Sequence, residues 1–258
     1  MPGPRATKAL GRAATALEEG TARVDLLIRR NEIPRINRGK GMGNPGAVAG
    51  YVDLPDPWKW RVNSYVAREQ VPPPKASVLR VSRHANAHFR QGWALQSARM
   101  DGEEIVIGTS RGEVRCDFVI FSTGFKVDWA ARPFLARIAG CARSWADRGP
   151  VPADAEASLA ELPDLGPAFE FLPGDRAGCE DVSRVHCFCY PAMMSHGSVS
   201  GDIPAISDGA ARLSQALASL FYVEDIEHHF ARAQAYAEQE IDGDEWIPYA
   251  GEPAGGAS

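Results

Sequence analysis

The chain has 258 residues, of which 45% are hydrophobic and 24% charged, and this composition is typical of a globular protein rather than a disordered one. No apolar run approaches the roughly eighteen residues that a membrane span needs, and the N-terminus lacks the apolar core of a secretory signal, so we expect a cytoplasmic protein without a membrane span. The net charge of −5 is uneven, because residues 1–115 hold 19 Lys+Arg against 11 Asp+Glu, a balance of +8, whereas residues 116–258 have a balance of −13.

The basic half is the part where an anionic ligand is expected to bind. Its arginines are dispersed and are not interleaved with aromatic residues on one recognisable element. This pattern disfavours nucleic acid as a partner and favours a phosphorylated small molecule.

The chain opens with a predicted helix and strand. Apolar residues recur at helical spacing from Leu10 to Leu17, and Gly20 stands where a C-terminal cap belongs. Val24–Ile28 is a compact aliphatic strand closed by Arg29 and Arg30, so helix, tight turn and strand indicate the second half of a β-α-β unit. Neither the first strand nor its glycine-rich turn precedes the helix.

Residues 34–57 are rich in Gly, Pro and Asn and are predicted to form a loop. They contain a formal G-x-G-x-x-G at Gly41, Gly43 and Gly46, but no strand leads into it, Pro45 interrupts it and no amphipathic helix follows. We therefore reject it as a dinucleotide fingerprint. A helix is predicted near residues 58–66, followed by a proline-rich extended linker.

Short antiparallel strands are predicted between residues 78 and 116. Apolar residues there alternate with a period of two, as at Leu79 and Val81 and again at Ile105 and Ile107. Turn signals at Asp101-Gly102 and at residues 111–112 separate the strands.

Residues 118–121 are four apolar residues, Phe-Val-Ile-Phe, and they predict a strand that is buried on both faces. The strand ends at Ser122, Thr123 and Gly124, small residues that let a ligand approach the backbone. The alternative is a core strand followed by an ordinary turn.

The remaining chain contains one more predicted strand and three predicted helices. A helix is expected near residues 134–138, a proline-rich acidic loop at 149–175 and a buried strand at Val185–Tyr190. Two apolar stripes, at residues 210–220 and 226–237, are most simply core faces of helices. The tail from Gly243 is expected to be mobile.

The chain has five cysteines, an odd number, and is long enough to be stable without disulfide bonds. We therefore expect reduced thiols rather than a disulfide framework. Cys187 and Cys189 would share one face of a strand, as a metal or redox pair with His186 nearby. His186 would then point the other way, and no second ligand pair has zinc spacing. We therefore expect no metal site.

Ser195, His196 and Asp202 have the residue types of a hydrolase. A nucleophile elbow needs serine at the centre of G-x-S-x-G, and Val199 occupies that place between Gly197 and Gly201. The alternative is geometric, because Gly201-Asp202 followed by a helix near Pro204 would present backbone N–H groups to an electron-rich ring or a diphosphate.

Three segments carry a resemblance to a known family. Asp117–Phe125, D-F-V-I-F-S-T-G-F, resembles the D-x-V-I-x-A-T-G-F/Y segment of flavin-dependent monooxygenases and related two-dinucleotide-binding FAD/NAD(P)-dependent oxidoreductases. Ala13–Arg30 resembles the helix and second strand of their NADPH-binding unit, and Ser195–Leu217 resembles their closing glycine-aspartate segment and helix. The resemblance covers roughly residues 9–241.

The resemblance implies an α/β fold, an incomplete Rossmann-like three-layer architecture with a small antiparallel β meander. It divides the chain into a partial NADPH-binding domain at residues 1–125, the C-terminal part of a flavin-binding domain at 126–242 and a mobile tail at 243–258.

The resemblance also implies FAD and NADPH as cofactors, without identifying a catalytic residue. A basic residue at the end of the second strand can pair with the 2′-phosphate of NADPH. In this family the segment that Asp117–Phe125 resembles, here called the crossing segment, runs from the nicotinamide-binding domain back to the flavin domain and passes the cofactor. The closing segment lies beside the flavin. The cofactor-binding residues expected on this basis are Arg29, Arg30, Thr123, Gly124, Phe125, Gly201, Asp202 and Ile203.

Two departures from the family pattern qualify the expected activity. The sequence has neither the glycine motif of the FAD-binding unit nor the second glycine motif before the helix at Ala13, so the family pattern implies an N-terminally truncated member. The expected function is an FAD- and NADPH-dependent, monooxygenase-like oxidoreductase acting on a small molecule. The alternative is a non-catalytic remnant or nucleotide-binding module. Expected protein partners are a second copy of the chain or a chain supplying the missing FAD domain.

Overall fold

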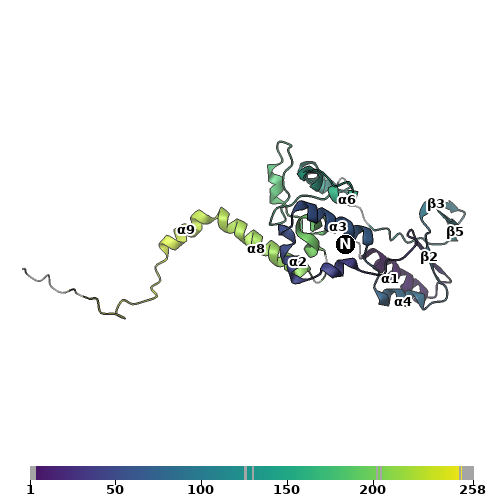
Figure 1. Cartoon of the computed structure of the whole chain (residues 1–258), viewed down its shortest axis with the longest axis horizontal. Helices are drawn as coiled ribbons and strands as arrows, with labels where there is room; N and C mark the ends of the chain where they lie inside the picture. The colour runs from purple at the N-terminus through teal and green to yellow at the C-terminus, as the bar shows by residue number, and fades with distance from the viewer. Residues whose placement is uncertain are drawn as a thin grey trace, which may run out of the picture. The chain divides into compact units, whose positions relative to one another are not determined.

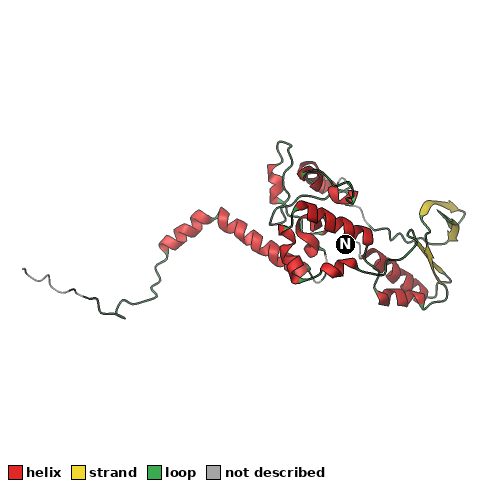
Figure 2. Cartoon of the chain, in the orientation of Figure 1, coloured by secondary structure: helices red, strands yellow, loops and turns green. Residues whose placement is uncertain are grey.

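The fold of the chain is mixed α/β with small sheets, as seen in a computed structural model that describes residues 4–124, 127–129, 131–201, 203, 205–249 and 251 (Figures 1 and 2). It divides into two compact units, Met1–Ser214 and Gln215–Ser258. No helix among these described residues is long and apolar enough to cross a membrane.

The helices and strands of the described chain are numbered in sequence order, and Figure 1 labels those for which there is room. The α-helices are α1 (Pro4–Glu18), α2 (Pro45–Gly50), α3 (Asp56–Glu69), α4 (Lys75–Ser82), α5 (Ala136–Cys141), α6 (Ala157–Ala160), α7 (Met193–His196), α8 (Ile206–Glu224) and α9 (Ile226–Ala235). The strands are β1 (Val24–Ile28), β2 (Ala87–Gln91), β3 (Leu95–Asp101), β4 (Glu104–Thr109) and β5 (Gly112–Cys116).

Strands β1 and β2 form a two-stranded parallel sheet, with Val24 opposite Ala87 and Ile28 opposite Gln91. Helices α1 and α4 pack with this sheet around one apolar core, to which α1 contributes residues of its predicted stripe and α4 contributes Val81. The predicted N-terminal helix and the strand Val24–Ile28 are confirmed, and Gly20 ends the helix region with φ +90°.

Helix α4 corrects the predicted strand at Leu79 and Val81. The residues buried toward the core are Val78 and Val81, which are three apart, whereas Leu79 is 54% exposed. Three consecutive prolines precede Lys75. Proline has no backbone N–H, and the first residues of a helix have no intrahelical acceptor for theirs, so prolines are tolerated where α4 begins.

Residues 34–57 contain short helical turns rather than a continuous loop. A 3-10 helix spans Arg38–Met42, α2 follows it, and a second 3-10 helix spans Tyr51–Asp53. Asn44 caps α2, since its side chain accepts a hydrogen bond from the Ala47 amide at 2.9 Å. The predicted helix near residues 58–66 is confirmed as α3.

Strands β3, β4 and β5 form an antiparallel meander, which confirms the antiparallel strands expected between residues 78 and 116 from residue 95 onward, whereas β2 in the same range pairs in parallel with β1. Two-residue turns join the strands, and both turns include or adjoin a glycine with positive φ, Gly102 at +65° and Gly112 at +124°. Val106 and Ile107 of β4 are buried.

The predicted buried strand at residues 118–121 is wrong. These residues are irregular, and Phe118, Ile120 and Phe121 are 88%, 53% and 60% exposed. Strand β5 ends just before them and pairs with β4 alone in the described part of the chain. An apolar run needs a neighbouring strand to satisfy its backbone groups, and none is described beside this one.

The predicted buried strand Val185–Tyr190 is also wrong. The segment makes one isolated antiparallel bridge, Glu170 to His186, and then enters a 3-10 helix at Tyr190–Ala192. Cys187 is nevertheless buried, in an apolar cluster that includes Phe169, Phe171 and Val199. Side-chain burial therefore holds this segment together with two backbone hydrogen bonds, from the Phe171 amide to the Val185 carbonyl oxygen at 3.0 Å and from the Cys187 amide to the Phe169 carbonyl oxygen at 2.8 Å.

Two cysteines that were expected to be reduced form a disulfide. Cys141 at the end of α5 is bonded to Cys179, with 5.2 Å between their Cα atoms. Cys116, Cys187 and Cys189 are free thiols. The expectation of reduced thiols therefore holds for three cysteines and is wrong for two.

Helices confirm the two C-terminal apolar stripes, but the stripes are not core faces. Leu220, Ile226 and Phe230 are 41%, 47% and 63% exposed. Leu213, near the start of α8, does pack against the cluster around Phe169. Amphipathic spacing predicted the helices correctly and their burial incorrectly.

Candidate functional site

The carboxyl end of the parallel sheet is where Arg29 and Arg30 lie, directly after β1. Arg29 is exposed, and its guanidinium has no hydrogen bond or ion pair within the described part of the chain. Arg30 is half-buried, and its Nη2 donates to the Arg68 carbonyl oxygen at 3.2 Å. Arg29 is thus the cation available to a ligand at this edge, and Arg30 is partly engaged.

Gly92 closes the same edge of the sheet. Its amide donates to the Arg30 carbonyl oxygen at 2.7 Å, and the Trp93 amide donates to that of Ile28 at 3.0 Å. Gly92 has φ +76°, and a Cβ there would stand 2.8 Å from Nη2 of Arg111. This close approach brings Arg111 to the edge, where its Nε donates to the Gly92 carbonyl oxygen at 3.2 Å.

Arg111 is a residue that sequence reasoning missed as part of this edge. Its sequence signal was only that of a turn, since it precedes Gly112 between two predicted strands. The meander brings it beside Gly92, nineteen positions earlier in the chain. Ligands of parallel α/β sheets bind outside the carboxyl ends of the strands, so Arg29, Arg30 and Arg111 lie where an anionic ligand is expected.

Of the three cofactor-binding residues expected in the crossing segment, the structure describes Thr123 and Gly124, and Phe125 lies outside the described residues. Both described residues are exposed, and Gly124 has φ +94°, a conformation that glycine adopts without strain. The structure therefore explains the glycine of the T-G-F segment by its backbone conformation.

The expected flavin segment follows the 3-10 helix Gly197–Ser200 and precedes α8. Gly201 is exposed and Ile203 is 84% exposed, while Asp202 lies outside the described residues. The Ser200 hydroxyl donates to the Cys189 carbonyl oxygen at 2.8 Å, which fixes the turn on the preceding segment. The structure does not bring this segment and the Arg29 edge together through any described contact.

Ser195 and His196 are buried and have separate partners. The Ser195 hydroxyl oxygen accepts hydrogen bonds from Nε1 of Trp145 and from the Leu165 amide, each at 3.1 Å. Nε2 of His196 lies 2.9 Å from the Gly166 carbonyl oxygen, and the ring stacks on Phe169 at 3.7 Å between centroids.

This arrangement supports a structural role for Ser195 and His196. Burial lowers the pKa of His196 to about 4, which keeps the imidazole neutral, so Nε2 carries the proton that it donates to Gly166. Because neither side chain contacts the other through a described hydrogen bond, the pair lacks the geometry of a nucleophile and its base.

A buried carboxylate that sequence reasoning missed organises the loop at residues 149–175. Asp164 is fully buried and accepts a hydrogen bond at 2.8 Å from Nε of Arg143 and another at 2.8 Å from Nη1 of Arg148. Arg148 also donates to Asp56 of α3 at 2.8 Å. An acidic residue in a proline-rich loop gave no sequence signal for this network.

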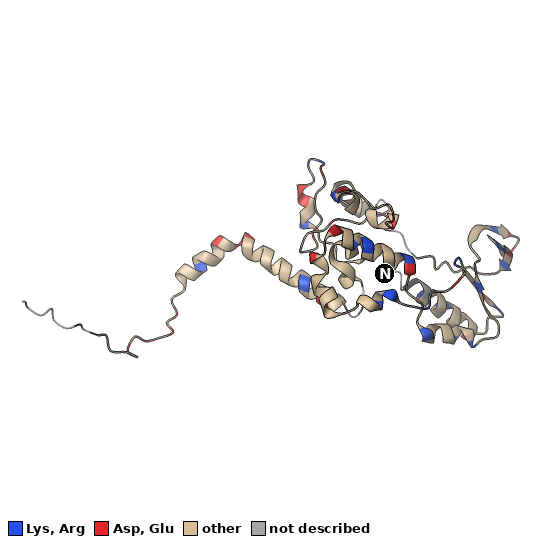
Figure 3. Cartoon of the chain, viewed as in Figure 1, with Lys and Arg blue, Asp and Glu red and all other residues tan. Residues whose placement is uncertain are grey.

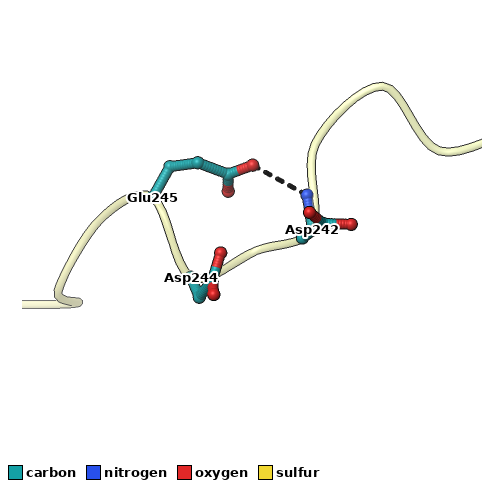
Figure 4. A group of neighbouring side chains, drawn as sticks. All are labelled: Asp242, Asp244 and Glu245. Carbon is teal, nitrogen blue, oxygen red and sulfur yellow. Dashed lines mark hydrogen bonds between the residues drawn. The ribbon is translucent and has the colours of Figure 1, made fainter.

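One group of acidic side chains, Asp242, Asp244 and Glu245, is close enough to hold a cation among the described residues (Figure 4). Their candidate ligand atoms lie within 4.8 Å of one another, and all three side chains are exposed. Glu245 already accepts hydrogen bonds at 2.8 Å from the amides of Asp242 and Gly243. These hydrogen bonds within a local turn explain why the three acidic side chains lie close together without a bound cation.

Basic side chains recur along the helices and strands of the N-terminal half, on α3, α4, β3 and β5 (Figure 3). Several are paired with acidic neighbours, as Arg99 is with Glu113 and Arg115 with Asp101. Arg29, like Arg61 and Arg68 of α3, has no carboxylate partner among the described residues.

Comparison with known proteins gives one informative similarity. No family model matches the chain. The chain is 32% identical over 221 residues to the FAD-dependent urate hydroxylase of Xanthomonas campestris pv. campestris, an alignment that covers 84% of this chain. It covers 46% of the relative, so the chain spans about half the length of the curated protein that it matches.

The relative's name is that of a flavin-dependent hydroxylase, which agrees with the family that the sequence motifs resemble. The aligned length is too long to rest on one motif, because it extends well beyond the three segments that resemble the family. FAD is the cofactor that the relative's name carries.

Proposed function

We propose that the chain is part of a flavin-dependent monooxygenase that uses FAD and takes its electrons from NADPH. The observation that carries the proposal is the 32% identity over 221 residues to an FAD-dependent urate hydroxylase. When bound, FAD would supply the chemistry of accepting a hydride and activating oxygen for insertion into a small-molecule substrate. Urate or a related heterocycle is the substrate class to test first, on the relative's name alone.

The protein's own residues fit the phosphate end of NADPH. Arg29 presents an exposed and unpaired guanidinium at the carboxyl end of β1, and Arg111 lies at the same edge through its contact with Gly92. A guanidinium binds phosphate through paired charge-assisted hydrogen bonds. Arg29 therefore supports the assignment of this edge to the 2′-phosphate of NADPH.

The residues fit FAD only in part. Gly201 and Ile203 are exposed beside the start of α8, but the Gly201 amide already donates to the Ser198 carbonyl oxygen at 3.2 Å and is not free for a ring system. The sequence contains no strand-turn-helix glycine motif for the FAD pyrophosphate, however. A second candidate function is a nucleotide-binding module without catalysis, for which the Arg29 edge would be sufficient by itself.

NADPH binding is tested by thermal shift with the Arg29→Ala variant. We expect this change to weaken NADPH affinity by about tenfold to a hundredfold, since one charge-assisted hydrogen bond contributes roughly 1.5–3 kcal/mol, and to leave NADH affinity unchanged because NADH lacks the 2′-phosphate. Arg184→Ala is the matched control, an exposed arginine outside the proposed site.

The two candidate functions are separated by flavin uptake and turnover. Wild-type protein mixed with FAD is desalted and its flavin absorbance measured, and NADPH oxidation is then followed with and without urate. Retained flavin with NADPH oxidation supports the monooxygenase. NADPH binding without retained flavin identifies the nucleotide-binding module, and equal NADPH affinity in both variants contradicts the assignment of Arg29.

A further inference from the structure

Cys187 and Cys189 form a close pair of thiols outside the proposed cofactor sites. Their sulfur atoms lie 3.6 Å apart, near van der Waals contact. Cys189 is exposed, whereas Cys187 is buried in the apolar cluster around Phe169. One sulfur is thus accessible to a reagent in solution, and the other stands directly behind it.

The backbone on both sides of the pair is fixed. The Cys187 amide donates to the Phe169 carbonyl oxygen at 2.8 Å, and the Cys189 carbonyl oxygen accepts from the Ser200 hydroxyl at 2.8 Å. Phe188, between the cysteines, packs edge to face on Phe169 with 5.2 Å between ring centroids. The two sulfurs are therefore held near each other by contacts on three consecutive residues.

A metal is a poor occupant for this pair. His186 is engaged elsewhere, since its Nδ1 lies 2.7 Å from the Ala168 carbonyl oxygen. No third His, Cys, Asp or Glu of the described chain joins the two sulfurs within ligand distance. Two thiolates alone leave a tetrahedral zinc site incomplete.

We propose that Cys187 and Cys189 are a peroxide-reactive dithiol site, at which Cys189 is oxidised first and Cys187 then closes an intrachain disulfide. The Cys189 thiolate attacks one oxygen of hydrogen peroxide, the O–O bond breaks, and hydroxide leaves to give the sulfenic acid. The Cys187 sulfur then attacks the Cys189 sulfur, the S–O bond breaks, and the Cys187 proton departs with the hydroxide as water. Two thiols lose two electrons in all, and one peroxide becomes two waters.

The electrostatics of the pair favour this order of events. The hydrogen bond from Cys187 is the largest cause that lowers the pKa of Cys189, to about 7, and the charge of Arg132 lowers it further against the effect of burial. The same hydrogen bond raises the pKa of Cys187 more than its burial does. Oxidation of Cys189 removes the thiolate partner, and with it the main obstacle to deprotonating Cys187.

Cys116 is an internal comparison for reactivity. It is a half-buried free thiol that donates to the Ile105 carbonyl oxygen, and no other cysteine sulfur is described beside it. Burial and the charges of Asp117, Asp25 and Glu104 raise its pKa. Cys189 and Cys116 should therefore differ in their rates with peroxide within one molecule.

The test is differential alkylation of the full-length protein after a peroxide time course, read by mass spectrometry. Trypsin cleaves after Arg184 and Arg212, so residues 185–212 form one peptide that contains Cys187, Cys189 and no other cysteine. Cys116, Cys141 and Cys179 fall in three other peptides. We expect peptide 185–212 to lose two alkylatable thiols and the mass of two hydrogens, about tenfold faster than Cys116 reacts.

The Cys187→Ser variant separates the two steps. We expect it to stop at the sulfenic acid of Cys189, which dimedone traps, whereas the wild type gives little trapped product. Urea-unfolded wild type is the control for the fold. In it, peroxide should oxidise Cys189 and Cys116 at similar rates. The proposal is overturned if peptide 185–212 keeps both thiols while Cys116 is oxidised, or if the two sites react at equal rates in the folded protein.

Discussion

Asp164 shows how much of this protein's stability rests on one side chain. It is fully buried in an otherwise irregular loop, and it holds Arg143 and Arg148 from opposite oxygens at 2.8 Å each. The backbone is tied in as well, since the Asp164 amide donates to the Arg143 carbonyl oxygen at 2.8 Å. Arg148 extends the network to Asp56, so one buried carboxylate connects the loop to α3.

Replacing Asp164 by Asn is expected to lower the free energy of unfolding by about 3 kcal/mol, because it leaves two guanidinium groups without their buried counter-charge. Urea unfolding followed by tryptophan fluorescence measures the change. Asp181→Asn is the matched control, since its pair with Arg137 at 2.8 Å is exposed on both sides and is expected to contribute less than about 1 kcal/mol. Equal effects of the two substitutions would contradict the role given to Asp164.

At the same scale, the sequence could suggest candidate site residues only where a local signal or a motif marks them. Arg29 was chosen because it follows a predicted strand and Gly124 because it stands in the T-G-F motif; the strand and a positive φ at Gly124 are observed, and the binding roles of both residues stay predictions. Arg111 and Asp164 were missed, because their roles come from contacts with Gly92 and with two arginines that are distant in sequence. No local pattern encodes such contacts.

At the scale of elements, local sequence predicted those whose stabilising contacts are also local. The strand β1 and the turns of the meander were predicted closely, since turns and hairpins lie within the segments themselves, whereas α1 begins at Pro4, six residues before the predicted start at Leu10. The apolar runs at residues 118–121 and 185–190 were misread as strands. A strand needs a partner, and neither run has a described ladder beside it, apart from one isolated bridge at His186.

Helix α8 packs so closely on the turn before the expected flavin segment that glycine is required at position 209. Gly209 is buried, and a Cβ there would collide with the Val199 carbonyl oxygen and stand 2.8 Å from its carbon. This contact is with backbone, which cannot rotate away. Gly11 in α1 is a helical glycine with nothing within 4 Å of the same position.

Replacing glycine by alanine should therefore change the free energy of unfolding in opposite directions in the two helices. We expect Gly209→Ala to destabilise the protein by about 1–3 kcal/mol through overpacking, and Gly11→Ala to stabilise it by about 0.5–1 kcal/mol through its helix propensity. Thermal unfolding of both variants and the wild type measures the difference. A stabilising Gly209→Ala would show that the helix and the turn are not in contact in solution.

At the scale of the whole molecule, the Cys141–Cys179 disulfide limits how far the unfolded chain can spread. The two residues are 38 positions apart, and the loop between them includes the Asp164 network. Much of this loop is irregular, with α6 and a 3-10 helix as its only regular elements between residues 142 and 178 of the described chain. The cross-link stabilises the fold by restricting the unfolded chain, by an amount that grows with the length of the loop it closes.

Removing the disulfide with Cys141→Ala plus Cys179→Ala is expected to lower the free energy of unfolding by about 4 kcal/mol, the loop-closure entropy that the unfolded chain regains for a loop of this length. Urea midpoints under non-reducing conditions measure it, and dithiothreitol should shift the wild type toward the variant while leaving the variant unchanged. Cys116→Ala controls for the loss of an unbonded sulfur. A double variant as stable as the oxidised wild type, with a wild type insensitive to reductant, would show that the bond does not form in the folded protein.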